Sequence, residues 1–265
     1  VINVASTTLE GDLSILDAAS DLLYETIVIV KGAIFNFSSV SIMQKHNKID
    51  IALKGEIEYA FEEIIKNEKD LKDIEGITYQ VNNEIISTPD RKLPDNLDYL
   101  PIPDRDLIDN DFYIRPDTRK PQTIIRVSKG CPNHCFFCLA TPVSGAKVRK
   151  RSPKNIVEEI KECVEKYGIT NFVFWSDIFN IDRDWVFELC NLIIESGLKI
   201  TWSANTRADT ADFEMAKLMY KSGCRLVSVG VESGSQYMLD KIGKKIKLDD
   251  VRRTIKLFKK AKRIN

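Results

Sequence analysis

The chain has 265 residues, which is enough for one large domain or two smaller ones. Its 39 Lys and Arg residues balance 39 Asp and Glu residues, so nothing favours broad attraction to nucleic acid or to an anionic membrane. No apolar run reaches the roughly 18 residues of a membrane span and no signal peptide is recognisable, so we expect a cytoplasmic, reducing location.

Residues 1–88 alternate between short apolar runs and helical patterns. Three runs rich in β-branched residues are typical of buried parallel strands: 1–5, 26–30 and 49–53. Apolar residues recur at helical spacing over 13–23, 38–45 and 56–65. Asn82 and Asn83 stand between two further apolar runs, and Asn tolerates the left-handed backbone of a tight hairpin. This half is therefore predicted to be a partial parallel sheet with a hairpin.

Residues 89–121 differ in composition from the segments on either side. Prolines interrupt the segment at 89, 94, 101, 103, 116 and 121. Proline removes a backbone donor and ends helices, so a continuous helix cannot form here. We interpret the segment as a linker between two domains.

Residues 122–265 show a stronger βα alternation. Strands are predicted at 123–128, 170–175, 198–204 and 225–231. Helices are predicted at 153–167, 184–196, 210–222 and 248–262. About four βα units in series predict an α/β fold whose parallel sheet curves toward a partial barrel. Ligands of such sheets bind at the carboxyl ends of the strands.

Three of the six cysteines cluster directly after the first strand of this second half. Cys131, Cys135 and Cys138 lie within eight residues, whereas Cys163, Cys190 and Cys224 are scattered in apolar stretches and are expected to be buried. Soft thiolates suit iron–sulfur clusters and zinc. Three thiolates on a four-iron cluster would leave one iron open to an external molecule, unlike the four-cysteine ferredoxin runs.

A zinc site is the alternative that this segment leaves open. His134 completes a set of three Cys and one His, which zinc accepts. Ligands so close in sequence would be cramped around a tetrahedral ion. His134 is otherwise a polar loop residue.

The spacing Cys-x3-Cys-x2-Cys, with aromatic Phe137 just before the last cysteine, resembles the radical S-adenosylmethionine (SAM) superfamily. The preceding residues 126–132 resemble the subgroup that often carries an N-terminal cobalamin-binding domain. The resemblance implies a 4Fe–4S cluster held by Cys131, Cys135 and Cys138, which reductively cleaves SAM to a 5′-deoxyadenosyl radical. It also implies a one-electron reductant such as flavodoxin or ferredoxin, while the substrate, a small molecule or a peptide, is not identified.

Further residues match this family at the ends of the later strands. The resemblance implies that Asp177 lies near the amino group of SAM, Asn205 and Arg207 face the active cavity, Glu232 binds the ribose and Lys244 reaches the carboxylate. Ser176 departs from the family pattern, which usually has a second Asp. Alternatives remain for three of them: a helix cap for Asp177, a surface ion pair for Arg207 and a solvated face for Lys244.

Residues 1–88 resemble the later part of a cobalamin-binding, Rossmann-like domain. Ser6, Thr7 and Thr8 would lie near the nucleotide tail of that cofactor, and Gly32 would make room for it. The Asp-x-His-x-x-Gly segment that ligates cobalt is not in this sequence. Cobalamin binding would thus need upstream sequence, or the domain serves as a scaffold. Both ends look cut through structure, and a fifth βα unit is expected after Asn265.

These observations predict a radical SAM enzyme with an incomplete barrel over 122–265, with methyl transfer the leading outcome if cobalamin is bound. The first alternative is a non-catalytic fragment or pseudoenzyme that holds a cluster. The second is a zinc-binding module. No basic stripe interleaved with aromatic residues favours a nucleic-acid partner.

Overall fold

The computed structural model describes residues 1–18, 26–67 and 69–264, and the chain divides into two compact units. Unit 1 comprises Val1–Leu93 and unit 2 comprises Pro94–Asn265. The strands of unit 1 are β1 (Ile2–Asn3), β2 (Ile29–Lys31), β3 (Ile51–Leu53), β4 (Ile77–Val81) and β5 (Glu84–Ser87). Its helices are α1 (Leu9–Leu13), α2 (Ile15–Ala18), α3 (Phe35–Lys45), α4 (Glu58–Lys66) and the short 3₁₀ helix η1 (Leu71–Asp73).

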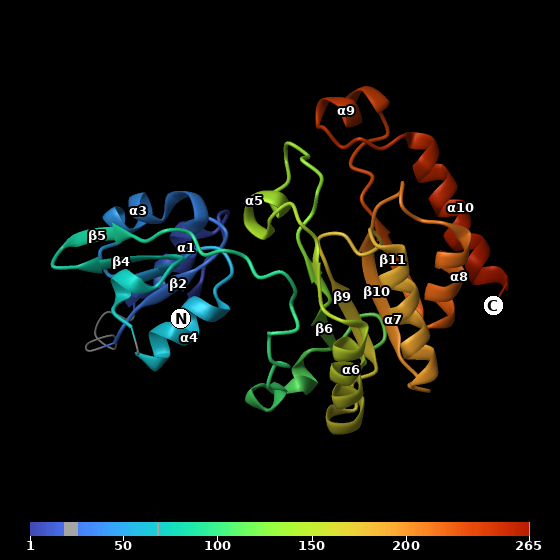
Figure 1. Ribbon diagram of the computed structural model, residues 1–265, viewed down its shortest axis with the longest axis horizontal. Helices are drawn as coiled ribbons and strands as arrows, with labels where there is room; N and C mark the ends of the chain where they lie inside the picture. Colours follow the sequence, from blue (N-terminus) through green and yellow to red (C-terminus); the bar gives the residue numbers. More distant parts are fainter. Residues whose placement is uncertain (19–25, 68, 265) are drawn as a thin grey trace. The chain divides into compact units, whose positions relative to one another are not determined.

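The sheet of unit 1 has the order β1-β2-β3-β4-β5, with its first three strands parallel and the last two antiparallel (Figure 1). The predicted hairpin between β4 and β5 is confirmed, and its turn residues Asn82 and Asn83 have φ of 49° and 63°. The predicted helix over 13–23 is only partly covered, because residues 19–25 lie outside the described residues. Unit 1 is thus a partial Rossmann-like sheet with a trailing hairpin, as predicted.

The described part of unit 2 contains six α-helices, a main sheet of four strands, two short 3₁₀ helices and a two-stranded ribbon. The strands of its main sheet are β6 (Gln122–Arg126), β9 (Asn171–Trp175), β10 (Thr201–Thr206) and β11 (Cys224–Val229). The ribbon pairs β7 (Ser128–Lys129) with β8 (Arg149–Lys150). The helices are α5 (Ala140–Ser144), α6 (Pro153–Tyr167), α7 (Arg183–Glu195), α8 (Phe213–Lys221), α9 (Gln236–Lys241), α10 (Leu248–Ile264), η2 (Arg105–Leu107) and η3 (Asn110–Phe112).

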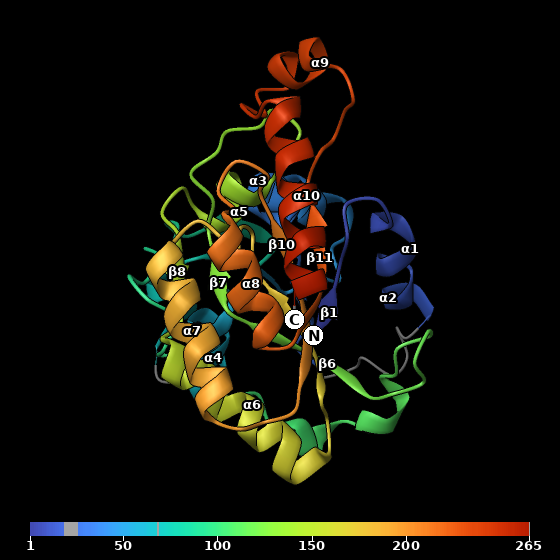
Figure 2. The same ribbon diagram turned by 90° about the vertical axis from the view of Figure 1, so that its right-hand side faces the viewer.

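The main sheet of unit 2 is parallel in the order β11-β10-β9-β6, and α6, α7, α8 and α10 follow one another along one side of it (Figures 1 and 2). Helices α6 to α9 each begin at a Ser or Asp side chain that accepts a backbone N–H three residues on; these caps are Ser152, Asp182, Asp212 and Ser235. The four predicted βα units are therefore confirmed. They form part of a barrel.

The core of unit 2 lies between this sheet and its helices. Four aromatic rings pack together at its centre, those of Phe174, Phe179, Trp185 and Trp202. The prediction that the scattered cysteines are buried is confirmed, because Cys163, Cys190 and Cys224 are at most 5% exposed. Burial raises the pKa of Cys163 to about 11 and that of Cys190 and Cys224 to about 12, so these thiols stay protonated and act as small apolar groups.

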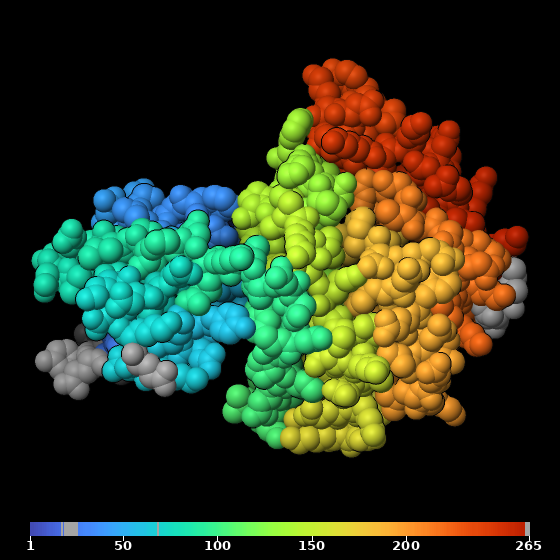
Figure 3. Space-filling view, viewed as in Figure 1, coloured from blue at the N-terminus to red at the C-terminus, as the bar shows by residue number. Residues whose placement is uncertain are grey.

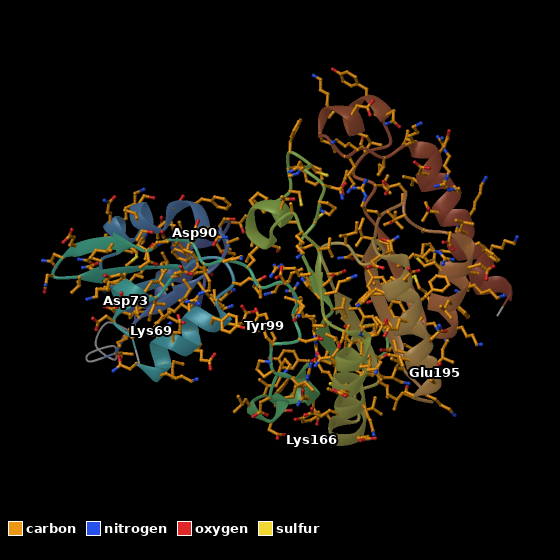
Figure 4. All side chains as sticks on the ribbon, in the orientation of Figure 1. Lys69, Asp73, Asp90, Tyr99, Lys166 and Glu195 are labelled. Carbon is orange, nitrogen blue, oxygen red and sulfur yellow. The ribbon has the colours of Figure 1, made fainter. Side chains whose placement is uncertain are left out.

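The segment 89–121, which the sequence suggests is a linker, belongs to unit 2 from Pro94 onward, and Figure 3 shows its green residues near 100. The Leu97 N–H donates to the Lys150 carbonyl at 3.3 Å. Lys166, at the end of α6 (Figure 4), pairs with Asp106. Deeper in, the carboxylate of Glu159 on α6 accepts from Arg105 and Arg151, and all three side chains are at most 5% exposed. This buried triad joins the segment to α6.

The strand ends differ slightly from the sequence prediction. Strand β10 begins at Thr201 rather than at 198, and just before it the Ile200 N–H donates to the Leu198 carbonyl at 3.2 Å instead of to a neighbouring strand. Strand β11 ends at Val229, two residues early, and the chain then bends toward Glu232, whose φ is 65°. Among the described residues, no helix combines the length and the apolar character that crossing a membrane requires.

Candidate functional site

A cavity of about 310 Å³ lies at the carboxyl ends of β9, β10 and β11, where the βα fold predicts ligand binding. Its walls come from the loop after β7, from the ends of three strands and from the segment after α9. All nine residues proposed from the sequence line it: Cys131, Cys135, Cys138, Phe137, Asp177, Asn205, Arg207, Glu232 and Lys244. Residues up to 113 positions apart in the chain, from Cys131 to Lys244, thus meet around one space.

The loop that carries the three cysteines is closed at its base by the β7–β8 ribbon. Gly130 begins the loop with a φ of 95°, and a Cβ here would lie 2.1 Å from the Lys147 carbonyl oxygen, so only glycine fits. Its N–H donates to the Asp177 carboxylate at 2.7 Å. Asp177 therefore fixes the start of the loop to the end of β9, and the helix cap considered from the sequence is supplied by Asp182 instead.

Hydrogen bonds inside this loop shape it around the thiols. The Asn133 side-chain amide donates to Cys131 Sγ at 3.4 Å, and the Ala140 N–H donates to Cys138 Sγ at 3.4 Å. The Thr141 hydroxyl lies 2.8 Å from the carbonyl oxygens of Cys131 and Asn133. Such N–H···S bonds are the ones that tune a thiolate-ligated cluster.

Two positively charged side chains line the same cavity as the thiols. Burial raises the pKa of the Cys135 thiol, while the charges of Lys244 and Arg207 act in the other direction. Lys244 is 8% exposed, so the solvated face considered from the sequence is wrong for this residue. Its ammonium pairs with Glu232 at 2.8 Å and lies 5.9 Å from the centre of the Phe137 ring.

Arg207 forms an ion pair, but a buried one rather than the surface pair that was the alternative. Its guanidinium holds Asp209 with two hydrogen bonds of 2.9 Å and also donates to the Lys244 carbonyl at 3.2 Å. Although burial opposes it, this pairing keeps the pKa of Asp209 below its usual value. The Arg207 side chain thus holds the loop after α9 in place.

Sequence reasoning missed several residues that line the cavity. The additional polar ones are Asn133, Thr206 and Ser228, and Gly230 lies beside Glu232 and Lys244. For Thr206 and Ser228 the available signal was their position at the carboxyl ends of β10 and β11, where ligands of parallel βα sheets bind. Ser176, which departs from the family pattern, is buried at 4% exposure and is not among the lining residues.

The donor set of this cavity fits an iron–sulfur cluster. Three thiols share one wall, and amide N–H groups are directed at two of them. In a cubane cluster each thiolate binds a different iron, so the three sulfurs need not converge on one point. Within the described ranges, no three His, Cys, Asp or Glu side chains are arranged to hold a single metal ion.

The parallel βα sheet of unit 2 and the three-cysteine loop that follows its first strand are together typical of barrel proteins that bind an iron–sulfur cluster. The sequence of residues 125–265 matches the family model for the radical SAM superfamily, and the chain belongs to that superfamily of enzymes. Membership implies a 4Fe–4S cluster and SAM. It also disfavours the zinc-binding and non-catalytic alternatives.

Relatives of the whole chain include an uncharacterized methyltransferase of Pyrococcus horikoshii, 30% identical over 251 residues that cover 93% of this chain and 54% of the relative. The anaerobic magnesium-protoporphyrin IX monomethyl ester cyclase of Cereibacter sphaeroides is 27% identical over 93% of this chain and 42% of its own length. The chain spans about half the length of these relatives.

A solved structure shares the fold of both units. It is the radical SAM methyltransferase TsrM of Kitasatospora setae, with a TM-score of 0.77 at 18% identity over 95% of this chain and 51% of TsrM. TsrM has been solved with tryptophan and a SAM analogue, and with cobalamin and a 4Fe–4S cluster. The predicted combination of a cobalamin-binding-like fold and a radical SAM barrel is thereby confirmed.

Two of the residues of unit 1 that the sequence associates with cobalamin, Gly32 and Thr8, have contacts within unit 1. A Cβ at Gly32 would lie 2.0 Å from the Val4 carbonyl oxygen, so packing within unit 1 explains this glycine. Ser6, Thr7 and Thr8 are exposed, and the Thr8 hydroxyl donates to Asp12 at 2.7 Å. These contacts single out no residue for a corrinoid, and we assign none.

Proposed function

We propose that this chain forms the cluster- and cofactor-binding part of a radical SAM enzyme that transfers a methyl group. Cys131, Cys135 and Cys138 would hold three irons of a 4Fe–4S cluster and leave the fourth to SAM. When bound, the cluster supplies the electron that cleaves SAM reductively. The electron donor we propose is a cytoplasmic one-electron carrier such as flavodoxin or ferredoxin.

The observation that carries this proposal is the composition of one cavity. The same cavity is lined by three thiols from the loop after β7 and by a cation and a carboxylate, Lys244 and Glu232, which lie 2.8 Å apart. A molecule with an amino-acid end and a ribose needs that combination. The cavity volume of about 310 Å³ is at the lower end of the range of small-molecule sites.

Each wall residue has a role in the proposal. Lys244 would bind the SAM carboxylate, Glu232 would accept hydrogen bonds from the ribose hydroxyls, and Asp177 would accept one from the ammonium group. Asn205 and Arg207 would bound the cavity from the end of β10. Phe137 would cover Lys244 and keep water from it. The Lys244–Glu232 pair must open as the two groups turn to their ligands.

Methyl transfer is proposed because the Pyrococcus relative is named a methyltransferase and matches almost the whole chain. The cyclase of Cereibacter supports a second candidate outcome, ring formation without methyl transfer. The two outcomes differ in what becomes of the SAM methyl group, because only the first moves it to another molecule.

The test uses the protein reconstituted with iron and sulfide without oxygen. We expect about four irons per chain, an electron paramagnetic resonance spectrum of the reduced protein that changes on adding SAM, and formation of 5′-deoxyadenosine with a chemical reductant. Cys135→Ala should lose the iron, and Cys163→Ala, a buried thiol in the same unit, should keep it. SAM carrying a labelled methyl group then separates methyl transfer from cyclisation.

Zinc in place of iron, or iron that survives Cys135→Ala, would overturn the proposal. A normal cluster whose spectrum ignores SAM would contradict the assignment of Lys244, Glu232 and Asp177.

A further inference from the structure

A buried amide lies behind the cavity wall and contacts Arg207. Asn180 follows β9 and is 1% exposed. Its Oδ1 accepts the Arg207 N–H at 2.9 Å, and its Nδ2 donates to the Arg207 carbonyl at 3.1 Å. One side chain thus satisfies both backbone groups of a single residue. Neither Asn180 nor this pairing was suggested by the sequence.

This contact extends the β-sheet beyond its last strand pair. The ladder between β9 and β10 ends at Phe174 and Ala204, since the chain after β9 turns away. The Phe179 N–H then donates to the Asn205 carbonyl at 3.2 Å, and Asn180 continues with Arg207. The side-chain amide replaces the strand neighbour that the Arg207 peptide lacks at this point. Without it, two buried backbone groups would have no partner.

The Arg207 side chain connects this fixed backbone to the cavity through contacts with two further residues. With its backbone fixed, Arg207 binds Asp209 on one side and donates to the Lys244 carbonyl on the other. The Lys244 ammonium then projects toward Glu232. Two hydrogen-bonded contacts, Asn180 with the Arg207 backbone and the Arg207 side chain with the Lys244 carbonyl, therefore connect Asn180 to the residue that carries the cation of the cavity, although Asn180 is not among the lining residues.

We propose that Asn180 is a positioning residue for cofactor binding, which acts through Arg207 to place the ammonium of Lys244. The inference rests on the proposed function, because Lys244 matters only if it binds the anionic end of the cofactor. A carboxylate at this position would still accept the Arg207 N–H but would face the Arg207 carbonyl with a second acceptor. An alanine would remove both contacts.

The experiment compares Asn180→Asp and Asn180→Ala with Asn171→Asp in the cluster-loaded chain. Asn171 is a matched control: it lies at the other end of β9, is 6% exposed, accepts from the Thr201 hydroxyl at 2.6 Å and donates to the Pro121 carbonyl at 3.2 Å. Lys244→Gln tests the proposed function itself. The two measurements are the Kd for SAM and the hydrogen exchange of the backbone amides at 205–209 and 242–246.

We expect both Asn180 variants to weaken SAM binding roughly 10-fold and to speed exchange in both segments. Asn171→Asp should lower the melting temperature comparably but leave the Kd unchanged. If Asn180→Asp does not fold, Asn180→Ala and its exchange pattern carry the test.

Three results would overturn the inference. In the first, Lys244→Gln weakens SAM binding but the Asn180 variants do not, which leaves the proposed function intact. In the second, Asn171→Asp weakens binding as much as the Asn180 variants, so burial alone is responsible. In the third, Lys244→Gln has no effect, and the assignment of Lys244 fails together with this inference.

Discussion

The main sheet of unit 2 and the parallel strands of unit 1 use the polar residues that follow them in different ways. In unit 2, Asp177, Arg207 and Glu232 follow successive strands and line one cavity. In unit 1, the corresponding polar residues are engaged in local contacts. Lys54, directly after β3, is 11% exposed and donates to Ser87 and Thr88 as well as pairing with Asp90.

Asp12, which lies on α1, makes local contacts with the segment after β1. Its carboxylate accepts the Ala5 N–H at 2.9 Å and the Thr8 hydroxyl at 2.7 Å, so it closes the turn after β1. Similar βα connections therefore have different results in the two units. In unit 2 the polar side chains line a cavity, whereas in unit 1 they bond to residues nearby. Fold alone does not specify a site; the direction of a few side chains does. Four predictions test this contrast.

The largest effect is expected at the buried triad of unit 2. Glu159→Ala leaves Arg105 and Arg151 buried without their carboxylate, which should cost about 3–5 kcal/mol of folding stability. Hydrogen exchange measured segment by segment should show the loss across 94–265 and little change in unit 1. Glu158→Ala, at the exposed neighbouring position, is the control. Equal effects of the two variants would contradict the role of the triad.

Two glycines allow the units to be disturbed separately. Gly130→Ala places a Cβ 2.1 Å from the Lys147 carbonyl oxygen, and Gly32→Ala places one 2.0 Å from that of Val4. Each should cost more than about 1 kcal/mol in its own unit. Only Gly130→Ala should reduce iron content after reconstitution. Loss of iron in Gly32→Ala would mean that the site depends on unit 1 as well.

A smaller change should alter the cluster without removing it. Asn133→Ala deletes one N–H···S bond to Cys131, so the protein should keep about four irons and have a more negative reduction potential, because such bonds favour the more highly charged reduced state. Redox titration measures this shift. His134→Ala, exposed and adjacent, should leave both quantities unchanged. An unchanged potential in Asn133→Ala would show that this bond is absent once iron is bound.

The smallest effect concerns acid stability. The pKa of Asp209 is held below its ordinary value of 3.8, so its pairing with Arg207 stabilises the fold at neutral pH and this contribution is lost as pH falls through the lowered value. Asp209→Asn should cost about 1 kcal/mol or less at pH 7 and flatten the acid limb of a stability–pH curve. Asp12, whose pKa is also lowered, mainly by the Ala5 N–H, allows the same measurement in unit 1. A curve that Asp209→Asn leaves unaltered would rule out this contribution.

Residues close to the strands were predictable from the sequence because position along a βα unit determines which edge they reach. Cys131, Asp177 and Glu232 each follow a strand, so a correct count of strands already assigns them to one edge. Lys244 lies 12 residues beyond Glu232, and only its resemblance to the superfamily pointed to the cavity.

The contacts that support the site were not predictable in the same way. Glu159 lies on an amphipathic helix, and nothing in that pattern indicates that its partners are Arg105 and Arg151. Asn180 looks like any polar residue in a loop, yet its partner is 27 residues away. Such pairs depend on how separate elements pack, which periodicity along one element does not encode.

The ribbon formed by β7 and β8 has a consequence for assembly. It joins Ser128 to Lys150 and Lys129 to Arg149, so backbone pairing that involves no metal ligand closes the loop of residues 130–148 at its base. Closing a loop of flexible chain carries an entropic cost that grows with the length of the loop. In this protein the pairing of β7 with β8 offsets that cost, so iron binding does not have to. The three thiols are then held at a high local concentration relative to one another. Once iron is bound to the first thiol, binding by the other two thiols should therefore be faster than dissociation of the iron from the first.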